Sequence, residues 1–189
     1  MNNPYWHEDV KPHVIDFDEV RSLCLRAYSI LGASRSLMGL PGDEIGGPLV
    51  NLFFARAEPD LNGILLNLAV KMRTFEDVLT MAERKTEYDS FCEAQFEDGE
   101  LGSIGFDGQG VLERKDLTFR EACNKIIHGL DIRAVYDNGS NDRDENWTWG
   151  MTGIIEISGL QRDKQWDAWL SVEDFLHACL SIANGFDQK

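Results

Sequence analysis

The stretch "LTFREACNKIIHGLD", residues 117–131, decides how the chain divides into helical and extended parts. Thr118 and Glu121 form a T-x-x-E capping box, which predicts that a helix begins directly after Thr118. Gly129 fits the left-handed position that commonly ends a helix, so we expect a helix over residues 119–128. After this helix the hydrophobic pattern changes from helical to extended. The stretch therefore separates a helical first part of the chain from a part that contains strands.

The predicted helix has two different faces. Arg120, Asn124 and His128 follow one another at intervals of four residues and share a polar face. This row is the candidate site of the chain, with the wet side of a core helix as the simpler alternative. The opposite face, which we expect to lie in the core, consists of Phe119, Ala122, Cys123, Ile126, Ile127 and Leu130.

The chain before this stretch has the spacing of amphipathic helices. Pro59 is expected to stop one helix, and Asp60 is expected to cap the next. The glycine-rich, acidic segment "EDGELGSIGFDGQG", residues 97–110, lacks the G-K-[ST] sequel of a phosphate loop and is predicted to be a flexible loop. The predicted helices cover residues 16–38, residues 48–57 and a long stretch from residue 60 toward residue 96.

The chain after the stretch contains three strand candidates and a closing helix. In the longest strand candidate, Met151, Ile155 and Ile157 share one face, which predicts a sheet with one dry side. The closing helix begins at Ser171, which approximates a capping box with Asp174. The strand candidates are "DIRAVYD" (residues 131–137), "WTWGMTGIIEISG" (residues 147–159) and "QWDAWL" (residues 165–170).

These elements predict a mainly helical α+β fold. We expect a bundle of about five helices with a small three-stranded antiparallel sheet inserted before the C-terminal helix. Residues 1–189 form one predicted domain, with residues 1–15 as an N-terminal extension and residues 131–170 as a β-meander insertion. A length of 189 residues and a hydrophobic share of 43% are sufficient for one ordinary domain with a core.

The composition narrows the cellular setting and the cofactors. No segment approaches the ~18 apolar residues of a membrane helix, and the first residues lack the pattern of a signal peptide, so we expect a cytoplasmic protein without membrane contact. The four cysteines contain no C-x-x-C pair. The segment "DRDEN", residues 142–146, lacks the glycine of a calcium loop, and His7 and His13 near the N-terminus have no further support as metal ligands. We expect neither metal nor cofactor.

Charge is the strongest compositional signal. The chain has 18 basic and 33 acidic residues, a net charge of −15. Binding to RNA or DNA is disfavoured, because nucleic-acid affinity depends largely on basic side chains that neutralise phosphates. The acidity suits a partner with a basic surface, and it also suits simple solubility.

The segment "CNKIIH", residues 123–128, resembles the Arg-Asn-x-x-x-His signature of HEPN domains. HEPN domains are small helical bundles common in prokaryotic toxins, phage-defence proteins and RNA-cleaving effectors. The resemblance implies a dimer whose arginine and histidine meet at the interface and cut RNA without metal. Asn124 matches the polar position of the signature and His128 matches its catalytic histidine. Cys123 stands where the family has arginine, so the usual cation is missing from its usual place.

Three functional hypotheses follow. The first is a noncatalytic HEPN-like protein of a prokaryotic or phage-defence system, which binds a protein partner or itself as a homodimer. The second is a metal-independent endoribonuclease in which His128 is the general acid/base, Arg120 stabilises phosphate charge and Asn124 orients one of them. The third is an acidic inhibitor that mimics nucleic acid on a basic protein surface.

Overall fold

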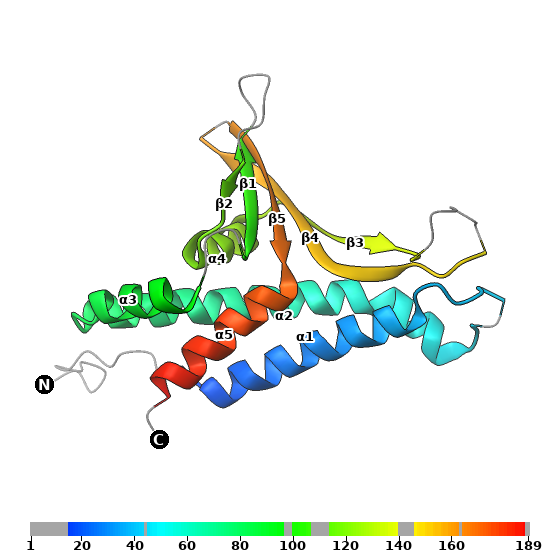
Figure 1. The fold of residues 1–189 in the computed structure, drawn as a ribbon, viewed down its shortest axis with the longest axis horizontal. Coiled ribbons are helices and arrows are strands. Elements are labelled where there is room, and N and C mark those ends of the chain that lie inside the picture. Colours follow the sequence, from blue (N-terminus) through cyan, green and yellow to red (C-terminus); the bar gives the residue numbers. More distant parts are fainter. Residues whose placement is uncertain are drawn as a thin grey trace, which may run out of the picture.

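The computed structural model describes residues 15–43, 45–96, 100–106, 114–139, 146–162 and 164–187, so only residue 15 of the predicted N-terminal extension is included. Within these residues a layer of helices lies below a five-stranded sheet (Figure 1). The helices are α1 (Phe17–Leu37), α2 (Pro48–Met81), α3 (Lys85–Gln95), α4 (Phe119–His128) and α5 (Val172–Phe186). The strands are β1 (Gly102–Phe106), β2 (Lys115–Asp116), β3 (Asp131–Asp137), β4 (Gly150–Gln161) and β5 (Lys164–Ser171).

The helical layer is built on the apolar stripes of α1, α2 and α5. Asp16 caps α1 by accepting a hydrogen bond from the Glu19 amide, so the predicted first helix is confirmed. Phe75 of α2 lies in an aromatic cluster with Phe17 of α1 and Phe186 of α5, at ring separations of 5.2 and 5.3 Å. The α2 stripe that the sequence predicts is buried as Leu61, Leu65, Leu68, Met72, Phe75 and Leu79.

Two predicted helix boundaries are wrong. Pro59 does not stop a helix, because α2 continues through it for 34 residues in all. Pro59 is exposed, so its ring faces solvent, while Ala57 and Leu61 on either side of it are buried. The long helix then ends at Met81 instead of running toward residue 96, and Glu83 takes a left-handed φ of 59° before α3 begins. Burial of the apolar stripe outweighs the hydrogen bond that proline cannot donate.

The predicted three-stranded sheet is also wrong. The sheet has five strands in the order β2-β1-β5-β4-β3, and all neighbours are antiparallel. It is not an insertion within residues 131–170, because β1 and β2 precede α4 in the chain. β1 lies in the glycine-rich segment that was expected to be a loop. Its Ser103 and Ile104 pair with Trp169 and Ala168 of β5, and this distant strand supplies the hydrogen bonds that hold β1 extended.

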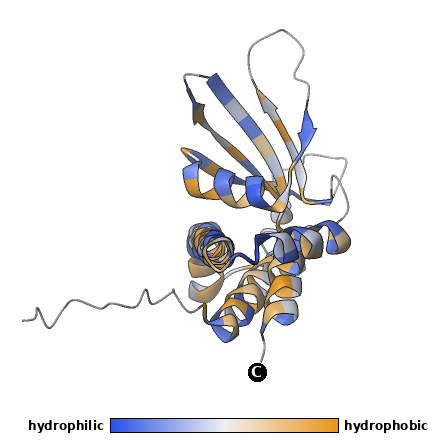
Figure 2. Cartoon of the chain, turned by 90° about the vertical axis from the view of Figure 1, so that its left-hand side faces the viewer, coloured by the Kyte–Doolittle hydropathy of each residue, from blue (hydrophilic) through white to orange (hydrophobic). Residues whose placement is uncertain are grey.

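The two faces of the sheet differ in burial. Met151, Ile155 and Ile157 of β4 are buried, so the predicted dry face is confirmed. The alternate positions are open to solvent: Glu156 is exposed, and Trp169 is half-exposed beneath the Arg114 guanidinium, 5.0 Å from its ring centre. Figure 2, turned by 90°, shows the strands above most of the helices, with one helix lying against the sheet. Side chains at alternate positions of one strand thus point into the core and out to solvent.

The outer edge of β3 is closed by α2. Glu58 accepts a hydrogen bond from the Ala134 amide at 2.7 Å and another from the Tyr136 hydroxyl at 2.9 Å. Asn62 donates to the Ile132 carbonyl at 3.3 Å. Two ladder groups of this edge strand, the Ala134 amide and the Ile132 carbonyl, therefore bind helix side chains of the same chain instead of a further strand.

Candidate functional site

The boundaries of α4 place the candidate row. Thr118 accepts a hydrogen bond from the Glu121 amide at 3.2 Å, and the Glu121 carboxylate accepts one from the Thr118 amide at 3.3 Å, so the predicted capping box is confirmed. Gly129 does not take the left-handed conformation that the sequence suggested: its φ is −63°. Glycine is required there for close packing, since a Cβ atom would lie 2.7 Å from the Ile157 side chain.

The apolar stripe of α4 is buried over most of its length. Phe119, Ala122, Cys123 and Ile126 are in the core, and Ile127 is half-buried. Leu130 is 74% exposed, so its assignment to the core is wrong. It follows the end of the helix, and its amide donates to the Ser158 carbonyl at 2.8 Å as the chain enters β3.

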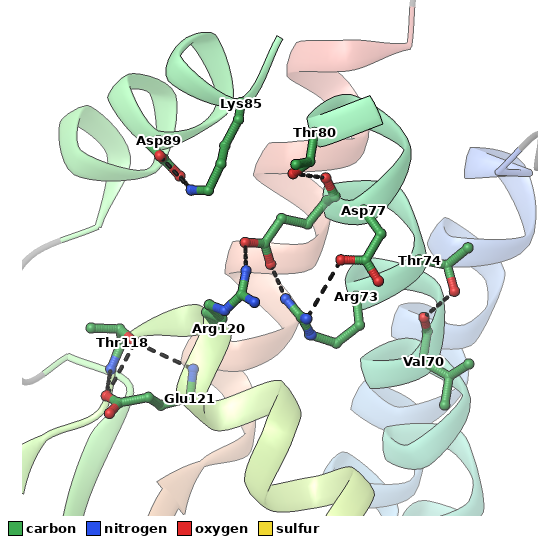
Figure 3. A network of polar contacts seen from close by, with 11 residues as sticks. Val70, Arg73, Thr74, Asp77, Thr80, Lys85, Asp89, Thr118, Arg120 and Glu121 are labelled. Carbon is green, nitrogen blue, oxygen red and sulfur yellow. Dashed lines mark hydrogen bonds and ion pairs between the residues drawn. The ribbon is translucent and has the colours of Figure 1, made fainter. Parts of the chain in front are cut away.

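Arg120 is paired with a buried carboxylate. Its guanidinium donates to Glu76 of α2, which is 3% exposed, and Arg73 of α2 donates to the second oxygen of the same carboxylate. The Asp77 carboxylate lies 3.6 Å from the Arg73 guanidinium. In Figure 3 the labelled Arg73 and Arg120, from two elements, point toward each other, and both donate to the Glu76 carboxylate. We call Glu76, Arg73 and Arg120 the Glu76 cluster; in it, the Arg120 guanidinium is bound to a carboxylate that it shares with Arg73.

Asn124 and His128 are not joined to Arg120. Asn124 is half-buried and His128 is exposed, and in the described part of the chain neither makes a side-chain hydrogen bond or an ion pair. His128 lies two helical turns beyond Arg120, which corresponds to about 12 Å along the helix axis. Within one chain the predicted row is therefore not a single site: Arg120 belongs to an α2–α4 contact, and His128 faces solvent.

Cys123 confirms its predicted place in the core. It is 1% exposed, and burial raises the pKa of its thiol well above the ordinary range, so the thiol is neutral. At the position where the HEPN signature has arginine, this chain thus has an uncharged core group. Neither charge nor reactivity is available from it.

A pocket of about 540 Å³ lies beside Arg120, between α3, the start of β1 and the β2–α4 connection. Its inner wall is apolar: Tyr88, Leu101, Leu117 and Phe119 are buried, and the half-buried ring of Phe96 lies 5.7 Å from that of Phe119. Burial raises the pKa of the Tyr88 hydroxyl, which keeps it protonated. A concave apolar wall of this kind is typical of a binding site.

The rim of the pocket is charged. Lys85 binds both carboxylate oxygens of Asp89, at 2.7 and 2.5 Å, and Arg120 binds Glu76. The two remaining acids of the lining, Glu93 and Asp116, are exposed and have no ion-pair partner among the described residues. The lining therefore has two cations against four carboxylates and a surplus of negative charge.

Sequence reasoning missed Glu76 and the whole α3 wall of the pocket. A signal for Glu76 exists, because this acid stands among Met72, Phe75 and Leu79 within the apolar stripe of α2. An acid at a core-facing helical position requires a cation, and Arg73 stands three residues before it. The second cation, Arg120, is 44 residues away and cannot be paired from spacing.

His7, His13 and residues 142–145 lie outside the described residues. Among the residues that are described, no group of three or more His, Cys, Asp or Glu side chains could hold a metal ion, and no helix is long and apolar enough to cross a bilayer.

Comparisons with protein-family models, with curated proteins and with solved structures found no match to this chain. The HEPN resemblance of residues 123–128 and the phage-defence setting that it implies stay predictions.

Proposed function

We propose that this chain is a noncatalytic binding protein and that the pocket beside Arg120 is its binding site. The observation that carries the proposal is the pairing of Arg120 with the buried Glu76 carboxylate. The HEPN-like interpretation of α4 is retained in its noncatalytic form. Its protein partner has a basic surface, in keeping with the net charge of −15.

The pairing of Arg120 weakens the endoribonuclease hypothesis. Cleavage by the 2′-hydroxyl of RNA requires a cation that stabilises the negative charge of the transition state. If Arg120 moved to a phosphate, Glu76 would lose one of two cations while it remained buried, at a cost of about 1–3 kcal/mol. Lys125, the other basic residue in the last turn of α4, has its ammonium over the rings of Phe106 and Trp166, 5.4 and 4.2 Å from their centres. Within one chain, the endoribonuclease hypothesis therefore lacks an available cation that would stabilise the transition state.

The pocket gives positive support for binding. Its volume of about 540 Å³ is within the usual range for ligand sites, and its wall combines apolar rings with a few polar groups. Its surplus acids oppose an RNA phosphate and favour a basic group. The same argument makes RNA the disfavoured partner.

An RNA-cleavage assay tests the noncatalytic part of the proposal. Single-stranded and structured RNAs are incubated in EDTA with the wild type, with His128→Ala and with His177→Ala, whose histidine is exposed on α5 and serves as the matched control. We expect background cleavage in all three samples. Cleavage by the wild type and by His177→Ala that is lost in His128→Ala would overturn the proposal.

Light scattering accompanies this assay because the HEPN resemblance implies that arginine and histidine come from two subunits. Cleavage by a dimer, lost in both Arg120→Ala and His128→Ala, would establish the endoribonuclease hypothesis instead. A chain that leaves RNA intact both as a monomer and as a dimer agrees with the binding function.

A further inference from the structure

We propose that the pocket beside Arg120 receives an arginine side chain of the partner protein. This inference rests on the proposed binding function and specifies the chemistry of the ligand. It depends on three properties of the pocket: which of its charges are already paired, what its wall is made of, and which ligands its rim repels.

Two carboxylates of the lining have no cation partner in the described part of the chain. Lys85 is bound by Asp89, and Arg120 is bound by Glu76, so both cations of the lining already have a carboxylate partner. Glu93 on α3 and Asp116 on β2 line the same pocket, and neither has an ion-pair partner among the described residues. A guanidinium has five N–H donors in a planar fork, and carboxylates accept such donors in pairs. The rim thus provides acceptors that match it.

The wall of the pocket suits the apolar part of an arginine. Phe96 and Phe119 present aromatic rings, and Leu101 and Leu117 present aliphatic surface. A guanidinium stacks on aromatic faces, and the methylene stem of arginine packs on apolar surface while its head stays polar. Lysine lacks the planar head, so arginine uses this combination of rings and carboxylates better. The volume also accommodates the partner backbone next to the arginine.

An anion is the less favourable ligand. A phosphate or a carboxylate would have to displace Asp89 from Lys85 or Glu76 from Arg120, and it would meet the charges of Glu93 and Asp116. Both steps raise its free energy in the pocket. The ligand is therefore a cation with an apolar stem.

The test compares two probes of nearly the same shape, N-acetyl-arginine amide and its uncharged counterpart N-acetyl-citrulline amide. Each is titrated into the full chain, and amide resonances are followed by NMR. We expect millimolar affinity for the arginine probe, with shifts at Thr118, Phe119 and Cys92, and at least tenfold weaker binding of the citrulline probe. Equal binding of the two probes, or shifts confined to other parts of the chain, would overturn the inference.

Variants test whether the carboxylates of Glu93 and Asp116 bind the arginine probe. Glu93→Gln combined with Asp116→Asn changes two exposed side chains, and the amide spectrum verifies that the chain stays folded. We expect the dissociation constant of the arginine probe to rise at least fivefold, whereas Glu156→Gln on the open face of the sheet leaves it unchanged. An unchanged dissociation constant in the double variant counts against the inference.

The two proposals fail separately. No binding of the arginine probe by a chain that also leaves RNA intact rejects the inference and retains the binding function. Cleavage of RNA that depends on His128 rejects the binding function itself, whatever the probe does.

Discussion

Glu76 is the residue that determines what the cations around it can do. Its carboxylate is almost completely buried, and it is tolerated there because Arg73 and Arg120 reach it from α2 and α4. A buried carboxylate without a cation is strongly unfavourable, so the two guanidiniums are bound in place. Arg120 therefore contributes to the packing of α4 on α2 and has little freedom to serve another ligand.

Replacement of Arg120 tests this role. We expect Arg120→Ala to lower the free energy of unfolding by about 1–3 kcal/mol, because it removes one of two partners from a buried carboxylate. Urea unfolding is the measurement. Arg133→Ala is the control, since Arg133 pairs with Asp131 near solvent, and we expect a change of at most about 0.5 kcal/mol there.

A double-mutant cycle with Glu76→Gln isolates the pair. The expected coupling energy between Arg120 and Glu76 is about 1–2 kcal/mol. Strict additivity of the two substitutions would show that Arg120 does not depend on Glu76.

Cys92 is the one described cysteine that a reagent can reach. Cys24, Cys123 and Cys179 are buried, whereas Cys92 is half-buried in the lining of the pocket. Burial raises its pKa to about 11, while its hydrogen-bond contact with Tyr88 acts in the opposite direction. Since the thiolate is the reactive form, a raised pKa makes this thiol slow at neutral pH.

The pH dependence of Cys92 alkylation follows from that shift. Below a pKa of about 11, the thiolate fraction rises about tenfold per pH unit, so the rate with iodoacetamide should still be rising steeply at pH 9. Peptide mapping by mass spectrometry gives the rate at each pH. The urea-unfolded chain is the control, and its rate should level off above about pH 8.5, the ordinary range of cysteine. A native rate that levels off at the same pH would contradict the buried setting of Cys92.

Among the elements, α4 and α2 show how far local signals reach. The start of α4 is readable because a capping box joins residues three apart, and the structure has both of its hydrogen bonds. Pro59 also predicts a helix end from local sequence, but α2 continues through it because the apolar stripe on the opposite face of the helix is buried. Local chemistry thus defines a helix end only where tertiary packing does not oppose it.

Pro59 should be a stability cost that the fold tolerates. We expect Pro59→Ala to raise the free energy of unfolding by about 1–2 kcal/mol, because alanine restores an amide donor and a favourable helical residue at an exposed position. Thermal or urea unfolding measures the gain. Arg56→Ala, on the same exposed stretch of α2, is the control and should change stability little. A loss of stability in Pro59→Ala would mean that the proline shapes α2 in a way the fold requires.

On the scale of the whole molecule, the sheet marks the limit of sequence reasoning. β3, β4 and β5 are recognisable because each contains several residues of alternating or apolar character, and β4 and β5 are close in sequence. β1 consists of five residues with two glycines, and it becomes a strand through pairing with β5 more than fifty residues later. The pocket depends on the same long-range assembly, since α3, β2 and α4 meet only in the folded chain. The acidic residues of the pocket can be read from the sequence, but their proximity in the folded chain could not be predicted from it.

The closed β3 edge has a consequence for the behaviour of the protein at high concentration. Fibril growth and strand exchange both begin when an unpaired edge accepts a strand from another molecule. Here the Glu58 carboxylate and the Asn62 amide already bind that edge from within. A second molecule must first displace α2 side chains before it can extend the sheet through β3. The α2 side chains therefore disfavour growth of the sheet from one molecule to the next through β3.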